Sequence, residues 1–318
     1  MRVKSNKLAL RVLSTATFLA MVSSCATAAF AGTYYMEDGS ISIVAKTDGN
    51  YITQGTTIND QKDAGETVIT NHDSETASKN TVTIKAEEDC TANVTLDNVN
   101  IDASKTGKAA LTVTGTGDTE IELSGDNTLV SGSGHAGLEK SDTYGSEPSQ
   151  NGSLTINAED PDSSLTATGG TSGAGIGGAS HRDSSNITIT GGSITATAGS
   201  NSGSGRTYCG AGIGGGAYGK GNNINITGGT VNATGGEGNS SYHFGGAGIG
   251  GGFNSGANNI TISGNDTRVT ATGKDGGAGI GGGYAGTADS ITISGGTVDA
   301  TGGSSGAGIG GGGNRYYS

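Results

Sequence analysis

The chain has 318 residues, of which 63 are glycine and two are proline; 14% are charged, and the formal net charge at pH 7 is −12. So much glycine argues against a mainly helical protein, because each glycine inside a helix costs about 1 kcal/mol relative to alanine. The absence of a Gly-X-Y period excludes collagen, and the acidic charge argues against partners such as nucleic acid or anionic membranes.

The first 31 residues have the composition of a secretory signal peptide. They carry four basic and no acidic residues, then a stretch of small and apolar residues that ends in the A-x-A cleavage pattern Ala29-Phe30-Ala31. We expect residues 1–31 to be removed, which changes the net charge from −12 to −16, and the mature protein to be secreted or on the cell surface. A lipoprotein-like site before Cys25, which would leave that residue acylated, is the weaker alternative.

Two cysteines, Cys90 and Cys209, remain after that cleavage. An extracellular protein permits a disulfide. The repeat described next places them three or more coils apart, about 14 Å at the spacing of stacked strands, whereas a disulfide needs Cα atoms within about 7 Å. We predict two separate thiols.

A Gly-Ala-Gly-Ile-Gly-Gly string recurs through the second half of the chain. Its five copies are 29 to 37 residues apart and begin at Gly173, Gly210, Gly246, Gly277 and Gly306. Between copies lie an Ile-x-Ile string and then an Ile/Val-x-Ala-Thr string, and a less glycine-rich form extends back to Val94. The chain thus holds seven units, each with three short segments in which apolar and polar residues alternate, as in a strand with one buried face.

Three strands per unit in a fixed order, without hairpin turns, predict an all-β parallel β-helix (a solenoid) of about seven coils. An antiparallel roll or sandwich is the less favoured alternative. Residues 94–318 would form the β-helix, and residues 32–93 an N-terminal capping region that covers the first coil. We expect two inward ladders, one made of Ile187, Ile224, Ile260 and Ile291 and the other of Ile176, Ile213, Ile249, Ile280 and Ile309.

Most motifs that could carry chemistry have a structural explanation. The glycine string formally matches a dinucleotide-binding fingerprint, but it recurs five times and no helix follows it. The histidines occupy unrelated parts of the repeat, and no acidic cluster shares a coil with an arginine as in polysaccharide lyases or hydrolases. We therefore expect a protein that is not an enzyme.

Carboxylates and amides gather at turns of the early coils, and oxygen ligands of this kind bind calcium. The alternative is that Asp and Asn fill left-handed turn positions that glycine takes elsewhere. The candidate metal ligands are Asp97, Asn98, Asp102, Asp126 and Asn127.

Aromatic residues are rare, but several lie at similar offsets from the glycine string, which would align them in a column. Such a column can stack against sugar rings, or it can shield the turns from water. The candidates for carbohydrate contact are Tyr208, Tyr218, Tyr242, Phe253 and Tyr284.

The Ile/Val-x-Ala-Thr strings would also place threonines in outward columns on a flat face. Such a face could order water, so an ice-binding surface is a minor alternative function.

The Gly-poor early coils replace glycine with side chains that carry chemistry. Examples are Lys108, His135, Glu139 and Lys140.

The segments Val94–Ala103, Ile121–Leu129 and Ser133–Leu138, together with the glycine array, resemble a family of secreted bacterial carbohydrate-binding domain proteins with right-handed parallel β-helices. The resemblance spans about residues 80–318. It implies non-catalytic binding of an acidic polysaccharide such as pectin, assisted by calcium, which would have to bridge the acidic protein to a polyanion. The alternative is a structural or adhesive surface rod that binds a protein partner.

Overall fold

The computed structural model describes residues 32–63, 65–200, 206–238 and 244–314, which form three sheets that the chain visits in the repeating order A, C, B. Sheet A consists of β1 (Thr33–Tyr35), β5 (Thr67–Thr70), β7 (Thr91–Asp97), β10 (Asp118–Ser124), β13 (Leu154–Asn157), β16 (Ser184–Ile189), β19 (Gly221–Ile226), β22 (Ala257–Ile262) and β25 (Ala288–Ile293). Sheet C consists of β8 (Asn100–Asp102), β11 (Asp126–Val130), β14 (Ser164–Thr171), β17 (Ser193–Gly199), β20 (Thr230–Thr234), β23 (Arg268–Thr272) and β26 (Thr297–Thr301).

Sheet B has strands of only two residues from β12 onward. In spatial order it consists of β4 (Ile58–Asp63), β3 (Gly49–Gln54), β2 (Ile41–Lys46), β6 (Val82–Ala86), β9 (Leu111–Gly115), β12 (Leu138–Glu139), β15 (Ile176–Gly177), β18 (Ile213–Gly214), β21 (Ile249–Gly250), β24 (Ile280–Gly281) and β27 (Ile309–Gly310). Two short 3-10 turns, η2 (Met36–Asp38) and η3 (Pro148–Gln150), interrupt the connections.

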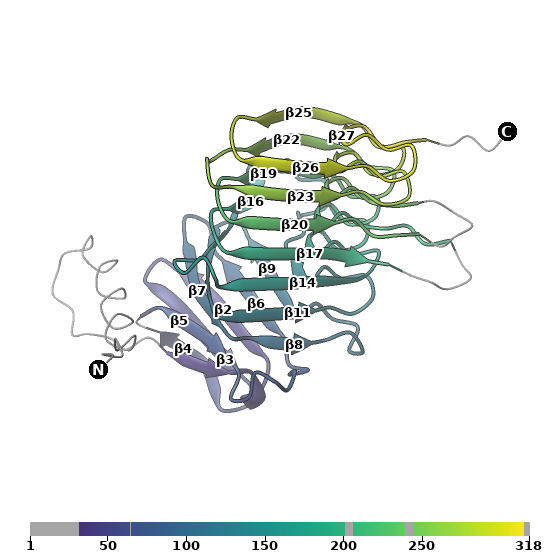
Figure 1. Cartoon of the computed structure of the whole chain (residues 1–318). Helices are drawn as coiled ribbons and strands as arrows, with labels where there is room; N and C mark the ends of the chain where they lie inside the picture. The colour runs from purple at the N-terminus through teal and green to yellow at the C-terminus, as the bar shows by residue number, and fades with distance from the viewer. Residues whose placement is uncertain (1–31, 64, 201–205, 239–243, 315–318) are drawn as a thin grey trace, which may run out of the picture. The chain divides into compact units, whose positions relative to one another are not determined.

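Each strand from β5 to β24 pairs in parallel with its equivalent in the next coil, so the coils stack as Figure 1 shows for the strands of sheet C. The prediction of a right-handed parallel β-helix is confirmed. In the described residues, seven coils, from β7–β8–β9 to β25–β26–β27, have a strand in every sheet.

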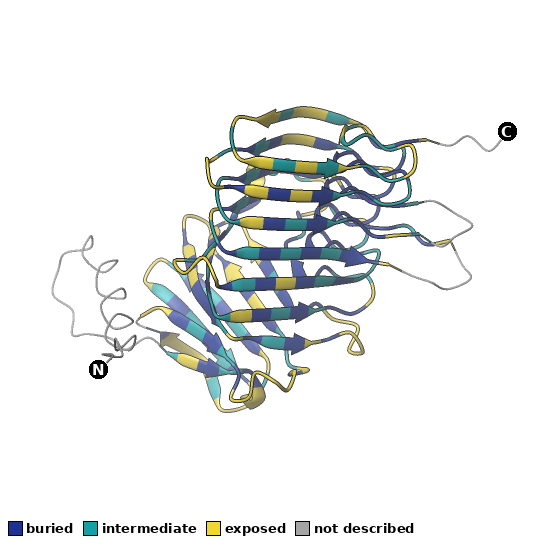
Figure 2. Ribbon diagram, in the orientation of Figure 1, coloured by how far each residue is buried: buried dark blue, intermediate teal, exposed yellow. Residues whose placement is uncertain are grey.

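The core is built from ladders of apolar side chains, as the alternation in the sequence predicts. Ile187, Ile224, Ile260 and Ile291 are neighbours in sheet A, and Ile176, Ile213, Ile249, Ile280 and Ile309 in sheet B. Figure 2 shows the resulting alternation of buried and more exposed residues along the strands. Burial of these ladders stabilises each coil through its neighbours, since one coil cannot bury its own apolar face.

Glycine follows each isoleucine of the sheet B ladder because the glycine-rich coils approach closely there. Gly214 has a φ of +130°, and a Cβ at this position would lie 2.1 Å from the carbonyl oxygen of Gly250 in the next coil. No side chain fits at that distance, and L-residues rarely adopt this backbone conformation. The repeated glycine is therefore a requirement of the glycine-rich coils of this sheet.

Residues 32–93, expected to form a cap, contribute strands to the same sheets. β1 and β5 extend sheet A, and β2 and β6 extend sheet B in parallel, while β3 and β4 add to β2 as an antiparallel hairpin. The outermost strand, β4, carries Asp60 and Lys62, and charged side chains on an edge strand oppose pairing with other chains. The boundary at residue 93 stays a prediction.

The predicted signal peptide, including Cys25, lies outside the described residues. Within the described part of the chain, no helix is long and apolar enough to cross a membrane.

The last coil allows a test of how much an isoleucine contributes to stability when a further coil covers it. Ile226 and Ile293 occupy the same ladder of sheet A through Ile262, but Ile226 is fully buried and Ile293 is 40% exposed. We expect Ile226→Ala to lower the free energy of unfolding by about 2–5 kcal/mol and Ile293→Ala by clearly less. Urea unfolding of the two variants measures the difference, and equal losses would contradict the stacking of coils described here.

Cys90 and Cys209 are both buried and unpaired, as the repeat register predicted. Burial, reinforced by the carboxylates of Asp275 and Glu237, raises the pKa of the Cys209 thiol to about 12. Because the thiolate is the reactive form, we expect native protein at pH 8 to leave Cys209 unmodified by iodoacetamide and denatured protein to react fully. Mass spectrometry after alkylation checks this, and rapid native labelling of Cys209 would contradict it.

Candidate functional site

The repeat is interrupted where the chain leaves sheet B in the coil β10–β11–β12. Fourteen residues connect β12 to β13, whereas six connect β15 to β16 in the next coil. We call residues 140–153 the long loop. It begins directly after Glu139, which pairs in register with Gly177, so a carboxylate stands where the later coils carry glycine.

The start of the long loop is fixed by a buried ion pair. Lys140 is 4% exposed, and its Nζ lies 3.2 Å from Asp142 Oδ1. The same carboxylate oxygen accepts hydrogen bonds from the backbone N–H and the hydroxyl of Ser185 in β16, and the Ser184 hydroxyl donates to the Lys140 carbonyl. These bonds tie the loop to the following coil.

Burial lowers the pKa of Lys140, because loss of solvent disfavours its charged form, and the nearby Asp142 carboxylate only partly opposes this shift. A lysine with a lowered folded-state pKa binds its proton less tightly than in the unfolded chain. Its charge therefore opposes folding at neutral pH, and this opposition disappears as the pH rises through the folded-state pKa toward 10.5. The ion pair positions the loop at some energetic cost.

Asparagine side chains hold the far end of the long loop. The Asn151 Oδ1 accepts from the Thr143 N–H, and its Nδ2 donates to Ser146 Oγ and the Glu147 carbonyl. From the next coil, Asn186 Nδ2 donates to the carbonyls of Pro148 and Asn151 at 2.8 and 2.9 Å. Both ends of the loop are thus anchored by polar contacts.

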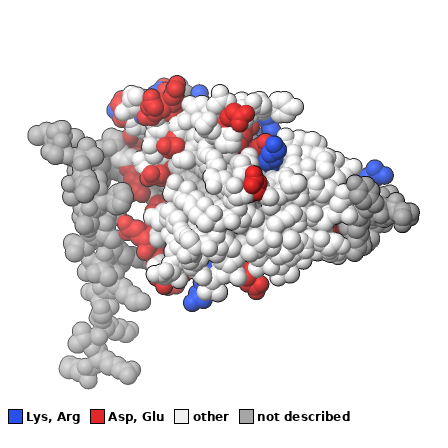
Figure 3. Space-filling view, turned by 90° about the horizontal axis from the view of Figure 1, so that it is seen from above, with Lys and Arg blue, Asp and Glu red and all other residues white. Residues whose placement is uncertain are grey.

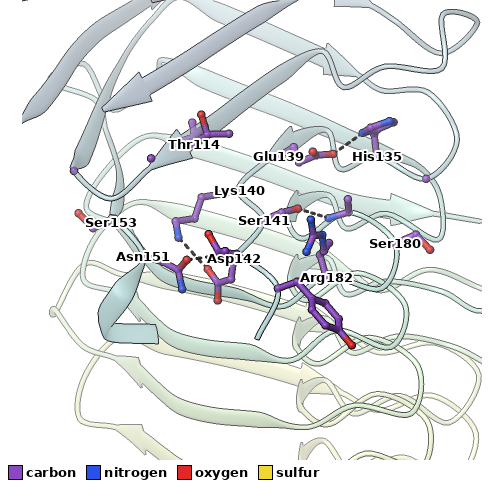
Figure 4. Close-up of a pocket in the computed structure, with 18 residues that line it drawn as sticks. Thr114, His135, Glu139, Lys140, Ser141, Asp142, Asn151, Ser153, Ser180 and Arg182 are labelled. Atoms are coloured by element: carbon purple, nitrogen blue, oxygen red, sulfur yellow. Dashed lines mark hydrogen bonds and ion pairs between the residues drawn. The ribbon is translucent and has the colours of Figure 1, made fainter. Parts of the chain in front are cut away.

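The long loop borders a pocket of about 690 Å³ at the passage from sheet B to sheet A. Figure 4 shows that the residues around this space come from three successive coils. Its polar and charged lining consists of Thr114, His135, Glu139, Lys140, Ser141, Asp142, Thr143, Tyr144, Asn151, Ser153, Ser180 and Arg182.

One wall of the pocket carries a histidine–carboxylate pair. His135 Nδ1 lies 2.7 Å from Glu139 Oε2, and the same oxygen accepts from the Ala136 N–H. Glu139 is nearly buried, whereas the His135 side chain is 35% exposed. The carboxylate therefore orients the imidazole, and the second ring nitrogen is available for another partner.

The opposite rim carries Arg182 and Tyr144. Tyr144 is 86% exposed at the loop tip, and the Arg182 guanidinium lies 6.0 Å from the centre of its ring. Within the described part of the chain, Arg182 makes no ion pair or side-chain hydrogen bond besides this contact. Its donors are available to an anionic ligand, since a guanidinium pairs well with a carboxylate.

The structure does not bring all five candidate calcium ligands together. Asp97 and Asp126 lie at the passage from sheet A to sheet C, whereas Asp102 ends β8, four positions further along the strand direction, about 13 Å away. Asn98 has a φ of +54°, and the amide oxygens of Asn98 and Asn127 accept backbone N–H groups. This supports the turn interpretation for the asparagines, and the described residues contain no group of three or more His, Cys, Asp or Glu side chains that could hold a metal ion.

The aromatic column exists but is packed. Phe253 lies between Tyr218 and Tyr284, with ring centroids 5.0 and 5.7 Å away, and Tyr208 contacts Tyr218 and Phe253. Phe253 and Tyr284 are 8% exposed, and burial together with a hydrogen bond to Tyr208 raises the pKa of Tyr218 to about 12. This geometry favours shielding of the turns over carbohydrate contact. Tyr242 lies outside the described residues.

Charge is distributed unevenly along the chain. Residues 32–172 carry 23 acidic and seven basic residues, whereas residues 173–318 carry six of each. Viewed onto the β25 end in Figure 3, carboxylates gather mainly on one side and a broad part of the visible surface is uncharged. The pocket lies at the boundary between the acidic and the neutral coils.

A β-helix repeat family model matches residues 224–253, 260–284 and 291–313. No curated protein and no solved structure matches the chain significantly. The matched residues belong to the glycine-rich coils rather than to the pocket, and β-helices include both enzymes such as pectate lyases and proteins without catalytic activity.

The sequence pattern indicated that the Gly-poor coils hold more chemistry, and His135, Glu139 and Lys140 do line the pocket. It did not predict Tyr144, Asp142 or Arg182. The signal in the sequence that could have located them is the long connection after Glu139. This connection is polar and contains one of the two prolines of the chain.

Asn186 is the side chain through which the next coil holds the long loop. We expect Asn186→Asp, which removes both donated hydrogen bonds at nearly constant size, to speed hydrogen exchange of residues 143–151 by about tenfold. Asn259→Asp is the matched control, because Asn259 has a similar positive φ but bonds only to Asn223. Exchange measured by mass spectrometry should change in the first variant alone; unchanged exchange there would contradict the anchoring role.

Proposed function

We propose that this chain is a non-catalytic carbohydrate-binding β-helix, secreted or on the cell surface, and that its ligand occupies the pocket beside the long loop. The observation that carries the proposal is the combination on the pocket rim: an exposed tyrosine next to an arginine whose donors are free. The fold itself serves as a rigid scaffold.

Sugars present apolar ring faces edged by hydroxyl groups, so their sites combine a flat aromatic surface with several hydrogen-bonding side chains. Tyr144 offers the ring, and Thr114 and Ser180 offer hydroxyl groups. Arg182 adds a planar cation that can bind a sugar carboxylate in bidentate fashion. These features favour an acidic sugar.

Calcium belongs to the proposal as an aid to binding rather than as a resident part of the pocket. The acidic coils would repel a polyanion, and a divalent cation at carboxylates such as the half-buried Asp97 and the exposed Asp126 would reduce that repulsion. The proposed partner is a polysaccharide or a cell-surface glycan.

The bases that line the pocket are mostly held by other side chains. Lys140 is buried and its amine is held by the Asp142 carboxylate, whereas His135 is held by Glu139 through Nδ1 and keeps Nε2 for another partner. A lyase base must reach the proton that it abstracts. We expect no release of unsaturated or reducing sugars from pectin, and release that His135→Ala abolishes would contradict the proposal.

A glycan array read with and without calcium tests the proposal, followed by affinity measurements on the glycans that bind. We expect acidic oligosaccharides to bind, and Arg182→Ala and Tyr144→Ala each to weaken binding about tenfold or more, because each removes a contact worth 1–3 kcal/mol.

Arg268→Ala is the matched control, since Arg268 is an exposed arginine on β23, outside the pocket lining. It should leave affinity unchanged. If no glycan binds in either condition, the proposal fails and the adhesive rod with a protein partner becomes the better explanation.

A further inference from the structure

A second cavity adjoins the pocket. It has a volume of about 580 Å³ and crosses β16, β19 and β22, so it runs along the direction in which the coils stack. Ser153 lines both cavities, so the two adjoin at this residue. We call this second cavity the groove; its lining is Ser153, Asn186, Thr188, Asn223, Ile224, Asn225, Asn259 and Thr261.

One column of the groove is a ladder of asparagines. Asn186, Asn223 and Asn259 have φ values of +57°, +50° and +55°, and each later amide donates to the oxygen of the one before at 2.9 Å. An amide has two N–H donors, and Asn223 and Asn259 each use one of them within the ladder. The second donor of Asn223 and that of Asn259 have no partner among the described residues.

The neighbouring column consists of Thr188, Asn225 and Thr261, which are register partners on adjacent strands. Their side chains make no hydrogen bond within the described residues. Amide and hydroxyl groups thus repeat at the coil spacing of about 4.8 Å, without a partner in the protein.

The groove lining contains no charged side chain, and residues 173–318 have a formal charge of zero. A lining of repeated neutral donors and acceptors suits a ligand that presents hydroxyl groups at regular intervals. It is too polar for a lipid chain or an amphipathic helix, which need an apolar floor.

We propose that the pocket and the groove form one continuous site that binds an extended, unbranched, uronate-containing polysaccharide lying along the direction of coil stacking. A carboxylate of the ligand pairs with Arg182, and the following sugars bind the two polar columns over β16, β19 and β22. This inference rests on the proposed function and adds the shape of the ligand and the path that it takes.

A length series of galacturonic acid oligomers, from the monosaccharide upward, tests this inference by calorimetry on the whole mature chain. We expect affinity to rise with each added sugar and to level off once the oligomer spans the groove. Asn225→Ala and Thr261→Ala should each weaken the longest oligomer about fivefold and leave the monosaccharide unchanged, whereas Arg182→Ala weakens every length.

Thr195→Ala is the control, because Thr195 is an outward residue of β17 in sheet C, away from the groove lining. Thermal melting confirms that the variants are folded. Equal affinity for all lengths, or a length dependence that Asn225→Ala and Thr261→Ala leave unchanged, would overturn the inference while the pocket proposal stands. Binding of no oligomer would overturn both.

Discussion

Every feature of this protein depends on one constraint: each coil must repeat the backbone path of the previous coil so that the parallel hydrogen bonds form in all three sheets. The constraint is strictest on sheet B, where Gly214 lies too close to the carbonyl of Gly250 for any side chain. The glycine-rich coils therefore carry no side-chain chemistry on that sheet. Functional groups are confined to the turns and to the outward positions of the other sheets.

The pocket forms where this constraint is relaxed. Glu139 occupies the register position of Gly177, and the connection that follows it is long enough to turn away from the stack. Such a loop would lose much conformational freedom on ordering. The Lys140–Asp142 pair at one end and the Asn186 hydrogen bonds at the other offset this cost and hold the loop in place. Tyr144 is left exposed at the tip of the loop.

The sequence predicted what repeats and failed where the repeat stops. The isoleucine ladders were readable because residues such as Ile187 and Ile224 recur at equivalent places, and one register explains them all. The distances of the aromatic residues from the glycine string also predicted the aromatic column. They did not predict that Tyr208 and Phe244, from separate connections, would pack against Phe253 and bury it. A column of exposed rings needs open space, which offsets alone do not describe.

The candidate site was only partly readable for the same reason. His135 and Glu139 stand out as departures from the glycine motif, but their pairing with each other depends on the turn between them. Arg182 belongs to the next coil and reaches the pocket only because the coils stack. Asp102 was grouped with Asp97 by its nearness in sequence, although a strand separates the two in space.

The distribution of charge changes how the acidic composition bears on function. The excess of carboxylates lies within residues 32–172, and the remaining coils are neutral. At physiological ionic strength the field of an exposed charge decays over about 8 Å, less than the height of two coils at about 4.8 Å each. A polyanion over β19 and β22 is therefore screened from most of the acidic coils, and Arg182 stands at their border. The local charges of the groove, rather than the net charge of the protein, decide whether an acidic ligand can lie there.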